Sequence, residues 1–352
     1  MLKFSEKKEL FNYQSLAVKN AIKSLWFYYQ KIRDFEENED FSANKYRKEE
    51  FNKIYRDNGL GNDVDIDLKK IRGDISDILI EAFPEAKDNI KFEYLINRMS
   101  FWMATGSGKS LIIVKLIEIL KILMDRGEIP KYDILFLTHR DNLINQFKEL
   151  VYEFNSANNY AKIILKELKE LPEVKRFQVF LNEGDIIVYY YRSDNLSDIQ
   201  KDKIIDYRNY FKNGKCYVFL DEAHKGDKDD SKRQQVFSII SRNGFLFNFS
   251  ATFIDIRDIN TCVYEFNLSS FINAGYGKKL KVLEQELLAF RNNEIYDEEE
   301  KIKTILKSLI ILTYLKKQYL EIKKVQTNIY HKPLCVVPVS YTHLTLPTIL
   351  LV

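Results

Sequence analysis

A glycine-rich segment followed by a lysine and a serine has the residue types needed to hold the phosphates of a nucleotide. Residues 103–110 read Met-Ala-Thr-Gly-Ser-Gly-Lys-Ser. Glycines allow a strand-to-helix turn to bring successive backbone N–H groups onto phosphate oxygens, and the helix adds its positive N-terminal end. The residues expected to form this turn are Thr105, Gly106, Ser107 and Gly108. The common GxxxxGKS/T pattern has glycine where this chain has Met103, so an ordinary glycine turn remains the alternative for this segment taken alone.

The two residues after the turn supply a cation and a hydroxyl group. Lys109 is predicted to reach the β- and γ-phosphates of ATP, and the Ser110 hydroxyl is predicted to bind Mg²⁺. These roles make ATP and Mg²⁺ the expected cofactors.

An acidic pair follows a second apolar run, in which Tyr217-Val218-Phe219-Leu220 precedes Asp221 and Glu222. Asp221 is placed to hold the Mg²⁺ shell, and Glu222 is placed to orient or deprotonate an attacking water. The alternative is an ordinary acidic loop. His224 completes the Asp-Glu-Ala-His string and is a candidate catalytic residue, although a structural histidine is the alternative for it.

Two further polar segments follow apolar runs. Ser250-Ala251-Thr252 is predicted to bond to the loop that begins at Asp221, which would let that loop sense the γ-phosphate; alone, it would read as a helix cap. Thr138-His139-Arg140 is predicted to hold a phosphodiester backbone through hydroxyl and cationic groups. For Arg140 the alternatives are pairing with Asp141 or capping its own helix.

These motifs, in this order, resemble those of the first RecA-like domain of superfamily two DEAD/DEAH-box helicases and translocases. The similarity is closer to the helicase portion of type III restriction enzyme res subunits, and it covers most of residues 5–338. The family's known activity implies an ATP-dependent helicase or translocase, that is, an ATP hydrolase acting on nucleic acid.

The resemblance assigns a role to each motif. Thr105–Ser110 match motif I, Asp221–His224 match motif II, and Ser250–Thr252 match motif III. Thr138–Arg140 match motif Ia, which contacts the nucleic-acid backbone in this family. Gln14 resembles the glutamine that reads adenine ahead of the phosphate loop, although a surface position on an amphipathic helix is the alternative.

The elements that must position these motifs alternate between strand and helix. Short apolar runs predict buried parallel strands at 99–104, 132–138, 185–191, 216–220 and 244–249. Helical spacing predicts helices at 6–33, 43–57, 74–82, 109–126, 141–154, 197–211, 231–242 and 294–325. This order indicates an α/β fold of the RecA-like P-loop NTPase type, with a parallel sheet covered by helices on both faces and ligands at the carboxyl ends of the strands.

The same pattern suggests five segments. We expect an N-terminal helical region with Gln14 and a charged insertion at 1–97, a RecA-like ATP-binding domain at 98–275, a helical connector at 276–332, the start of a truncated second RecA-like domain at 333–338, and a tail at 339–352. The tail resembles the translation of a sequencing-library adapter, which predicts a longer native protein. An arginine finger from the missing domain normally closes over the γ-phosphate, so residues 1–338 are expected to bind ATP·Mg²⁺ weakly and hydrolyse it slowly.

The amino-acid composition does not by itself decide which partners the protein binds. The net charge of +3 comes from 54 basic and 51 acidic residues, which neither demands nor excludes a polyanionic partner. Three separated cysteines without a CxxC pair indicate buried thiols in a reducing compartment, and no apolar run is long enough to cross a bilayer. These features favour a cytoplasmic protein without membrane contact.

The leading hypothesis is the ATP-binding motor of a DNA translocase from the restriction subunit of a type III-like restriction-modification system. Its expected partners are double-stranded DNA and a DNA methyltransferase subunit. The alternatives are a stand-alone DNA or RNA helicase and a nucleotide-dependent switch that binds no nucleic acid.

Overall fold

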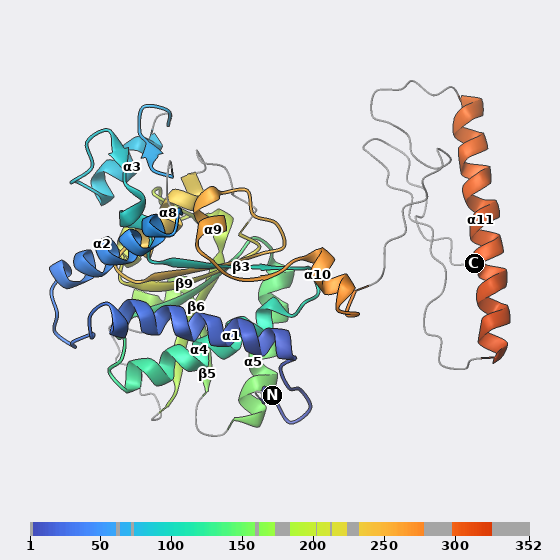
Figure 1. Ribbon diagram of the computed structural model, residues 1–352, viewed down its shortest axis with the longest axis horizontal. Coiled ribbons are helices and arrows are strands. Elements are labelled where there is room, and N and C mark those ends of the chain that lie inside the picture. The colour runs from blue at the N-terminus through green and yellow to red at the C-terminus, as the bar shows by residue number, and fades with distance from the viewer. Residues whose placement is uncertain are drawn as a thin grey trace. The chain divides into compact units, whose positions relative to one another are not determined.

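The computed structural model divides the chain into two units, Met1–Lys279 and Leu280–Val352 (Figure 1). The structure describes residues 3–60, 64–71, 74–158, 162–172, 184–201, 203–211, 213–223, 232–277 and 298–325. In the second unit it describes one helix, α11 (Glu298–Val325), where a long helix was predicted. The strand expected at 333–338 and the tail at 339–352 lie outside the described residues. The segment boundaries expected at residues 97 and 275 remain predictions.

A seven-stranded parallel sheet forms the centre of the first unit, counted over the described residues. Its strand order is β11-β3-β10-β9-β4-β6-β5, and every neighbouring pair is parallel. The strands are β3 (Arg98–Met103), β4 (Asp133–Thr138), β5 (Ile163–Glu167), β6 (Ile186–Arg192), β9 (Cys216–Asp221), β10 (Phe245–Ser250) and β11 (Cys262–Phe266). This sheet confirms the predicted α/β, RecA-like fold.

Helices cover both faces of the sheet, with α1, α4 and α5 on one face and α3, α8 and α9 on the other (Figure 1). The helices of the first unit are α1 (Asn12–Trp26), α2 (Phe41–Asp57), α3 (Asp74–Ala82), α4 (Lys109–Asp125), α5 (Asp141–Ala157), α7 (Arg208–Phe211), α8 (Lys232–Ile240), α9 (Ile256–Asn260) and α10 (Leu268–Asn273). A π-helical turn (Phe27–Lys31) extends α1, and 3-10 turns occur at Phe92–Leu95, Leu168–Glu170 and Ser193–Asn195. Two-stranded pairs join β1 (Ile66–Asp67) to β2 (Asn89–Ile90) and β7 (Leu196–Ser197) to β8 (Ile205–Asp206).

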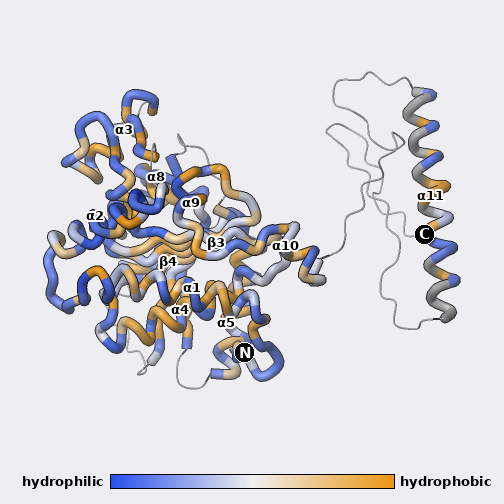
Figure 2. Tube along the Cα trace, viewed as in Figure 1, coloured by the Kyte–Doolittle hydropathy of each residue, from blue (hydrophilic) through white to orange (hydrophobic). Residues whose placement is uncertain are grey.

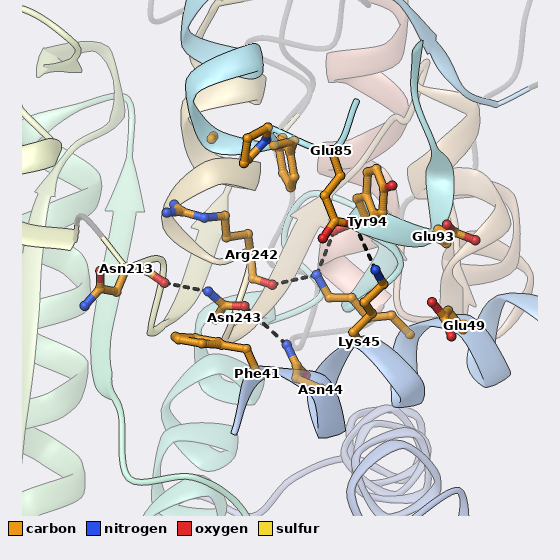
Figure 3. A pocket seen from close by; sticks show the side chains of 14 residues that line it. Phe41, Asn44, Lys45, Glu49, Glu85, Glu93, Tyr94, Asn213, Arg242 and Asn243 are labelled. Carbon is orange, nitrogen blue, oxygen red and sulfur yellow. Dashed lines mark hydrogen bonds and ion pairs between the residues drawn. The ribbon is translucent and has the colours of Figure 1, made fainter. Parts of the chain in front are cut away.

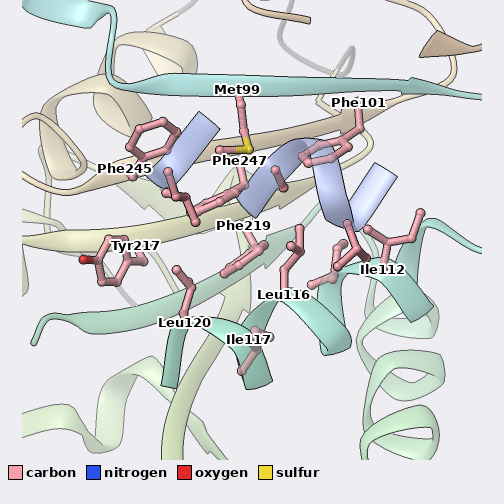
Figure 4. Close-up of a cluster of buried hydrophobic side chains, with 14 of the residues drawn as sticks. Met99, Phe101, Ile112, Leu116, Ile117, Leu120, Tyr217, Phe219, Phe245 and Phe247 are labelled. Carbon is pink, nitrogen blue, oxygen red and sulfur yellow. The ribbon is translucent and has the colours of Figure 1, made fainter. Parts of the chain in front are cut away.

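The central strands are apolar because both of their faces are covered. Every residue of β9 and β10 is buried, and hydrophobic stretches run through the sheet in Figure 2. On the α4 face, Leu116 points toward the rings of Phe219 and Phe247, which stack with centroids 4.4 Å apart (Figure 4). Such offset aromatic pairs and buried area hold the strands, and therefore the loops at their carboxyl ends, in fixed positions.

The prediction of a helix over residues 197–211 is wrong. The segment forms the strand pair β7–β8 and the four-residue helix α7. The Tyr207 N–H donates to the Ser197 carbonyl at 2.9 Å, and the Asp206 N–H donates to the Gln200 side chain at 3.1 Å. These bonds fold the segment back on itself and replace the bonds that a continuous helix would make.

Candidate functional site

The phosphate-binding turn joins β3 to α4. Gly106 and Gly108 have φ angles of +82° and +79°, a region that glycine enters without the steric cost met by other residues. The Ser107 N–H and hydroxyl both donate to the Ala104 carbonyl, at 3.2 Å and 2.7 Å. A Cβ added at Gly106 would meet nothing within 4 Å. The glycine therefore faces open space in which a phosphate can approach the backbone.

Gln14 and its neighbour Tyr13 on α1 form hydrogen bonds to this turn. The Gln14 amide and the Tyr13 hydroxyl each donate to the Ser107 carbonyl at 2.9 Å. Gln14 is only 2% exposed, so it is not the surface residue that the alternative required. A Cβ at Gly108 would lie 2.4 Å from the Gln14 amide nitrogen. The glycine is therefore required for the close approach of α1, and adenine reading by Gln14 remains a prediction.

The acidic pair lies at the same end of the sheet as the turn. β9 ends at Asp221, and β10 is the one strand between it and β3. The Lys109 ammonium lies 3.5 Å from the Glu222 carboxylate. The structure thus brings the cation of the first motif and the carboxylates of the second together. Ser110 is half-buried in the first turn of α4, and Thr105 is exposed.

Burial changes the chemistry of Asp221. Loss of solvation raises the pKa of the Asp221 carboxyl to about 6, and the Glu222 charge adds to this effect while Lys109 opposes it. Glu222 has a φ angle of +60°, and its N–H donates to the Asp221 carboxylate at 3.1 Å. A side chain costs roughly 1 kcal/mol in this left-handed region. Such strain is typical of residues held in place for function.

The residues present fit a magnesium nucleotide. A buried carboxylate with a raised pKa is stabilised when a divalent cation replaces its proton. The turn offers glycines, a helix N-terminus and Lys109, which together neutralise phosphate charge. No group of three or more His, Cys, Asp or Glu side chains with metal-binding geometry occurs among the described residues. This suits Mg²⁺, which takes only one or two protein carboxylates and completes its shell with water and phosphate oxygens.

The raised pKa of Asp221 predicts a pH dependence of stability. The carboxyl holds its proton more tightly in the folded chain than in the unfolded chain, where its pKa is about 3.9. Without metal, this group therefore contributes less stability as the pH rises from about 4 toward 6. Asp221→Asn should remove that dependence, so the variant should melt above the wild type at pH 7.5 and level with it at pH 4. Thermal melts at pH values across this range test the prediction. The same difference in melting temperature between the two proteins at every pH would contradict it. Added Mg²⁺ should raise the melting temperature of the wild type alone.

The third motif connects the two strands that carry the site. The Ala223 N–H donates to the Phe249 carbonyl at 3.0 Å, and the Trp102 indole donates to the Ala251 carbonyl at 3.0 Å. Ser250 is buried, and its hydroxyl accepts from the Thr252 N–H at 3.1 Å. Phe249, near the end of β10, is thus bonded to the turn after β9, and Ala251 is bonded to the strand before the phosphate turn. A bond from Ser250–Thr252 to the loop after Asp221 remains a prediction. His224 lies outside the described residues.

The segment after β4 lies one strand further along the same edge. Thr138 is buried, His139 is half-buried and Arg140 is exposed. Arg140 precedes α5, but its side chain makes no cap hydrogen bond, which excludes the capping alternative. Asp141 pairs with Arg192 at 3.0 Å, and no ion pair joins it to Arg140 among the described residues. Arg140 is therefore available to an external anion.

A basic groove beside this segment has no motif in the sequence. It is lined by Lys148 of α5, Lys169, Lys203, Arg192 and Tyr190, and its acidic lining residues are Asp141 and Glu167. The Lys148 ammonium lies 4.1 Å from the centroid of the Tyr190 ring. Over the residues that the structure describes, none of the three lysines forms an ion pair. They are scattered over three segments of the chain, and only the fold brings them together.

Comparison of the chain with known protein families agrees with this geometry. Residues 7–255 match the model of the family described as type III restriction enzyme, res subunit. No curated protein sequence matches the chain. Over the described residues, no helix is both long enough and apolar enough to span a bilayer. The family comprises helicase-like, ATP-binding P-loop motors of the restriction-enzyme type. With its phosphate turn, acidic pair and parallel sheet in place over the matched residues, the chain belongs to the type III restriction enzyme res subunit family.

Proposed function

We propose that this chain is the ATP-binding motor of a DNA translocase, and that it acts in the cytoplasm on double-stranded DNA. The observation that carries the proposal is the 3.5 Å approach of Lys109 to Glu222 at the edge of the sheet where the phosphate turn opens. A phosphate cradle, a cation and two carboxylates at one strand edge are the parts that phosphoryl transfer from ATP requires.

Each residue has a distinct role in this proposal. Lys109 neutralises the β- and γ-phosphates and exchanges its Glu222 partner for them. Ser110 and Asp221 hold Mg²⁺, which when bound supplies a positive charge that stabilises the phosphate oxygens. When Lys109 binds the nucleotide, Glu222 accepts a proton from water or orients it. His224 is proposed to assist at the same site.

The third motif is proposed to pass the state of the nucleotide to the sheet. The Ala223 N–H donates to the Phe249 carbonyl of β10, and the Ala251 carbonyl accepts from the Trp102 indole of β3. A shift of the turn after Asp221 would therefore move the segment Ser250–Thr252. Gln14 is proposed to read the adenine, which would require its bond to Ser107 to open or to be shared.

The nucleic acid is proposed to follow the next part of the same edge. Thr138, His139 and Arg140 would contact its backbone, and the groove containing Lys148 and Lys203 would extend this track. Unpaired cations near an aromatic ring bind phosphates without reading sequence. The finer assignment is a subunit of a type III-like restriction-modification system with a methyltransferase partner. A stand-alone helicase acting on DNA or RNA is the runner-up.

The test is nucleotide and nucleic-acid binding by the purified chain. We expect a fluorescent ATP analogue to bind only with Mg²⁺ present, and duplex DNA to be retarded in gels at low salt. Binding of neither single nor double strands, with nucleotide binding intact, would replace the motor by a nucleotide-dependent switch. Absence of Mg²⁺-dependent nucleotide binding would refute the proposal altogether.

The basic groove gives a quantitative prediction. Replacing both Lys148 and Lys203 by alanine should weaken duplex binding equally for all sequences, because these side chains would bind phosphates. The slope of log affinity against log salt should become shallower by about 0.9 for each phosphate that is no longer neutralised, or about 2 in total. Gel retardation at several salt concentrations measures the slope. Lys53→Ala, an exposed change on α2, is the control that should leave it unchanged.

A further inference from the structure

A pocket of about 410 Å³ lies away from the nucleotide site, where α2 meets the motor. Residues from four segments converge on it: α2, the stretch that follows α3, the turn between α7 and β9, and the turn between α8 and β10 (Figure 3). Its lining combines the rings of Phe41, Phe83 and Tyr94 with the cationic side chains of Lys48 and Arg242. Aromatic rings beside polar groups that converge on one concavity are features of small-molecule sites.

Lys48 is the unusual group in this lining. It is only 8% exposed, and its ammonium donates to the carbonyls of Tyr94 at 2.8 Å and Arg242 at 2.6 Å. Within the described ranges, no carboxylate forms an ion pair with it. An ammonium has three donors, so these two bonds leave one for a further acceptor. Burial lowers the pKa of Lys48 to about 7, and the nearby charges of Arg242 and Arg98 act in the same direction.

The acidic residues that line the pocket are either paired with other lysines or exposed to solvent. Glu85 pairs with Lys45 at 2.9 Å at the rim (Figure 3), and Glu93 pairs with Lys91 at 3.5 Å. Glu49 is exposed on α2. Lys48 is therefore a buried cation with which none of these carboxylates pairs, and a buried cation without an opposite charge is costly. An anion that entered the pocket would offset that cost.

We propose that this pocket binds a small organic anion, namely a carboxylate carried on a flat apolar body. The carboxylate accepts the remaining N–H of Lys48, and the apolar body packs against Phe41 and Phe83. Because α2 belongs to the segment before β3 while Arg242 lies just after α8, a bound anion ties this segment to the motor. The inference does not depend on nucleotide binding at Lys109, which lies in another part of the fold.

Benzoate is the probe, and benzamide is its uncharged counterpart. We expect titration calorimetry at pH 6.5 to give a dissociation constant of about 1 mM for benzoate, the range for a ligand of its size, and at least tenfold weaker binding of benzamide. Affinity for benzoate should fall about tenfold for each pH unit above 7, because Lys48 loses its proton while benzoate remains ionised. Equal binding of the two compounds, no binding of benzoate, or an affinity independent of pH would each overturn the proposal.

Two variants and a control locate the site. Lys48→Met should weaken benzoate binding at least tenfold while keeping the volume of the side chain. Phe41→Ala removes a ring that is 57% exposed, so the variant should fold even if Lys48→Met does not, and its affinity should fall several-fold. Lys53→Met, an exposed lysine on the same helix, should leave affinity unchanged. Unchanged affinity in Phe41→Ala, or a loss in Lys53→Met equal to that in Lys48→Met, would contradict the proposed site.

Discussion

Replacing Lys109 by alanine should weaken the binding of magnesium ATP at least about 100-fold. The lysine is expected to make charge-assisted hydrogen bonds to the nucleotide, each worth roughly 1.5–3 kcal/mol, and about 2.7 kcal/mol corresponds to a factor of 100. The loss should be larger than for a surface cation, because Lys109 is buried and its removal leaves the Glu222 carboxylate, 3.5 Å away, to repel the phosphates. Titration with a fluorescent ATP analogue measures the effect.

Lys121→Ala is the matched control for this experiment. Lys121 lies on the same helix and pairs with Asp125 at the end distant from the phosphate turn. Its substitution should leave nucleotide affinity unchanged, and both variants should remain folded. An affinity for ATP that survives in Lys109→Ala would show that the nucleotide does not bind at this turn.

Replacing Arg98 by methionine should lower the free energy of unfolding by about 3–5 kcal/mol, the usual result of removing one partner of a buried ion pair. Arg98 and Asp258 are both buried, with 3.4 Å between guanidinium and carboxylate. Arg98 also donates to the Ser238 hydroxyl at 2.9 Å, and Asn248 donates to the Asp258 carboxylate at 2.7 Å. The methionine variant would leave the Asp258 charge buried without its cation. Chemical denaturation measures the loss.

The partner substitution separates charge from packing. Burial raises the pKa of Asp258 to about 6 although Arg98 opposes this effect. Removing Arg98 should raise the pKa further, so the damage that charge causes in Arg98→Met should shrink as the pH falls toward 6. Asp258→Asn removes the charge while keeping the shape. The double variant Arg98→Met with Asp258→Asn should therefore be more stable than Arg98→Met alone at pH 7.5. If the double variant were the less stable of the two, packing rather than charge would explain the effect.

The strands that carry the motifs could be predicted because of where they lie in the sheet. β3, β4, β9 and β10 are covered on both faces and consist mainly of apolar residues. The edge strands β5 and β11 are mostly half-buried, so their residues mix polar and apolar types and give no such run. The helix prediction for 197–211 was wrong for a related reason. The apolar residues of this segment fit helical spacing, but they are buried around the parallel strand pair β7–β8.

The sequence identified the motifs that form the site, but it did not predict the contacts between them. The spacing of glycines, Lys109 and the Asp221–Glu222 pair identified the phosphate turn and the acidic pair. The insertion of β10 between β3 and β9 depends on long-range pairing that no local pattern encodes. The same holds for Gln14, whose helical position suggested either a surface or a functional role. Lys48 and Lys148 carried no signal, because their importance comes from what the fold places around them.

The paired donors on the Ser107 carbonyl have a consequence for how the protein can be divided. Tyr13 and Gln14 secure the phosphate turn from a helix that precedes the sheet by more than seventy residues of chain. A polypeptide that begins at Asn97 would retain the lysine and both carboxylates. The Ser107 carbonyl would then be exposed to water, and the phosphate turn would lack these two hydrogen bonds. The shape of the phosphate turn therefore depends on the first helix as well as on the glycines, and a shortened protein that keeps this turn should begin before Phe11.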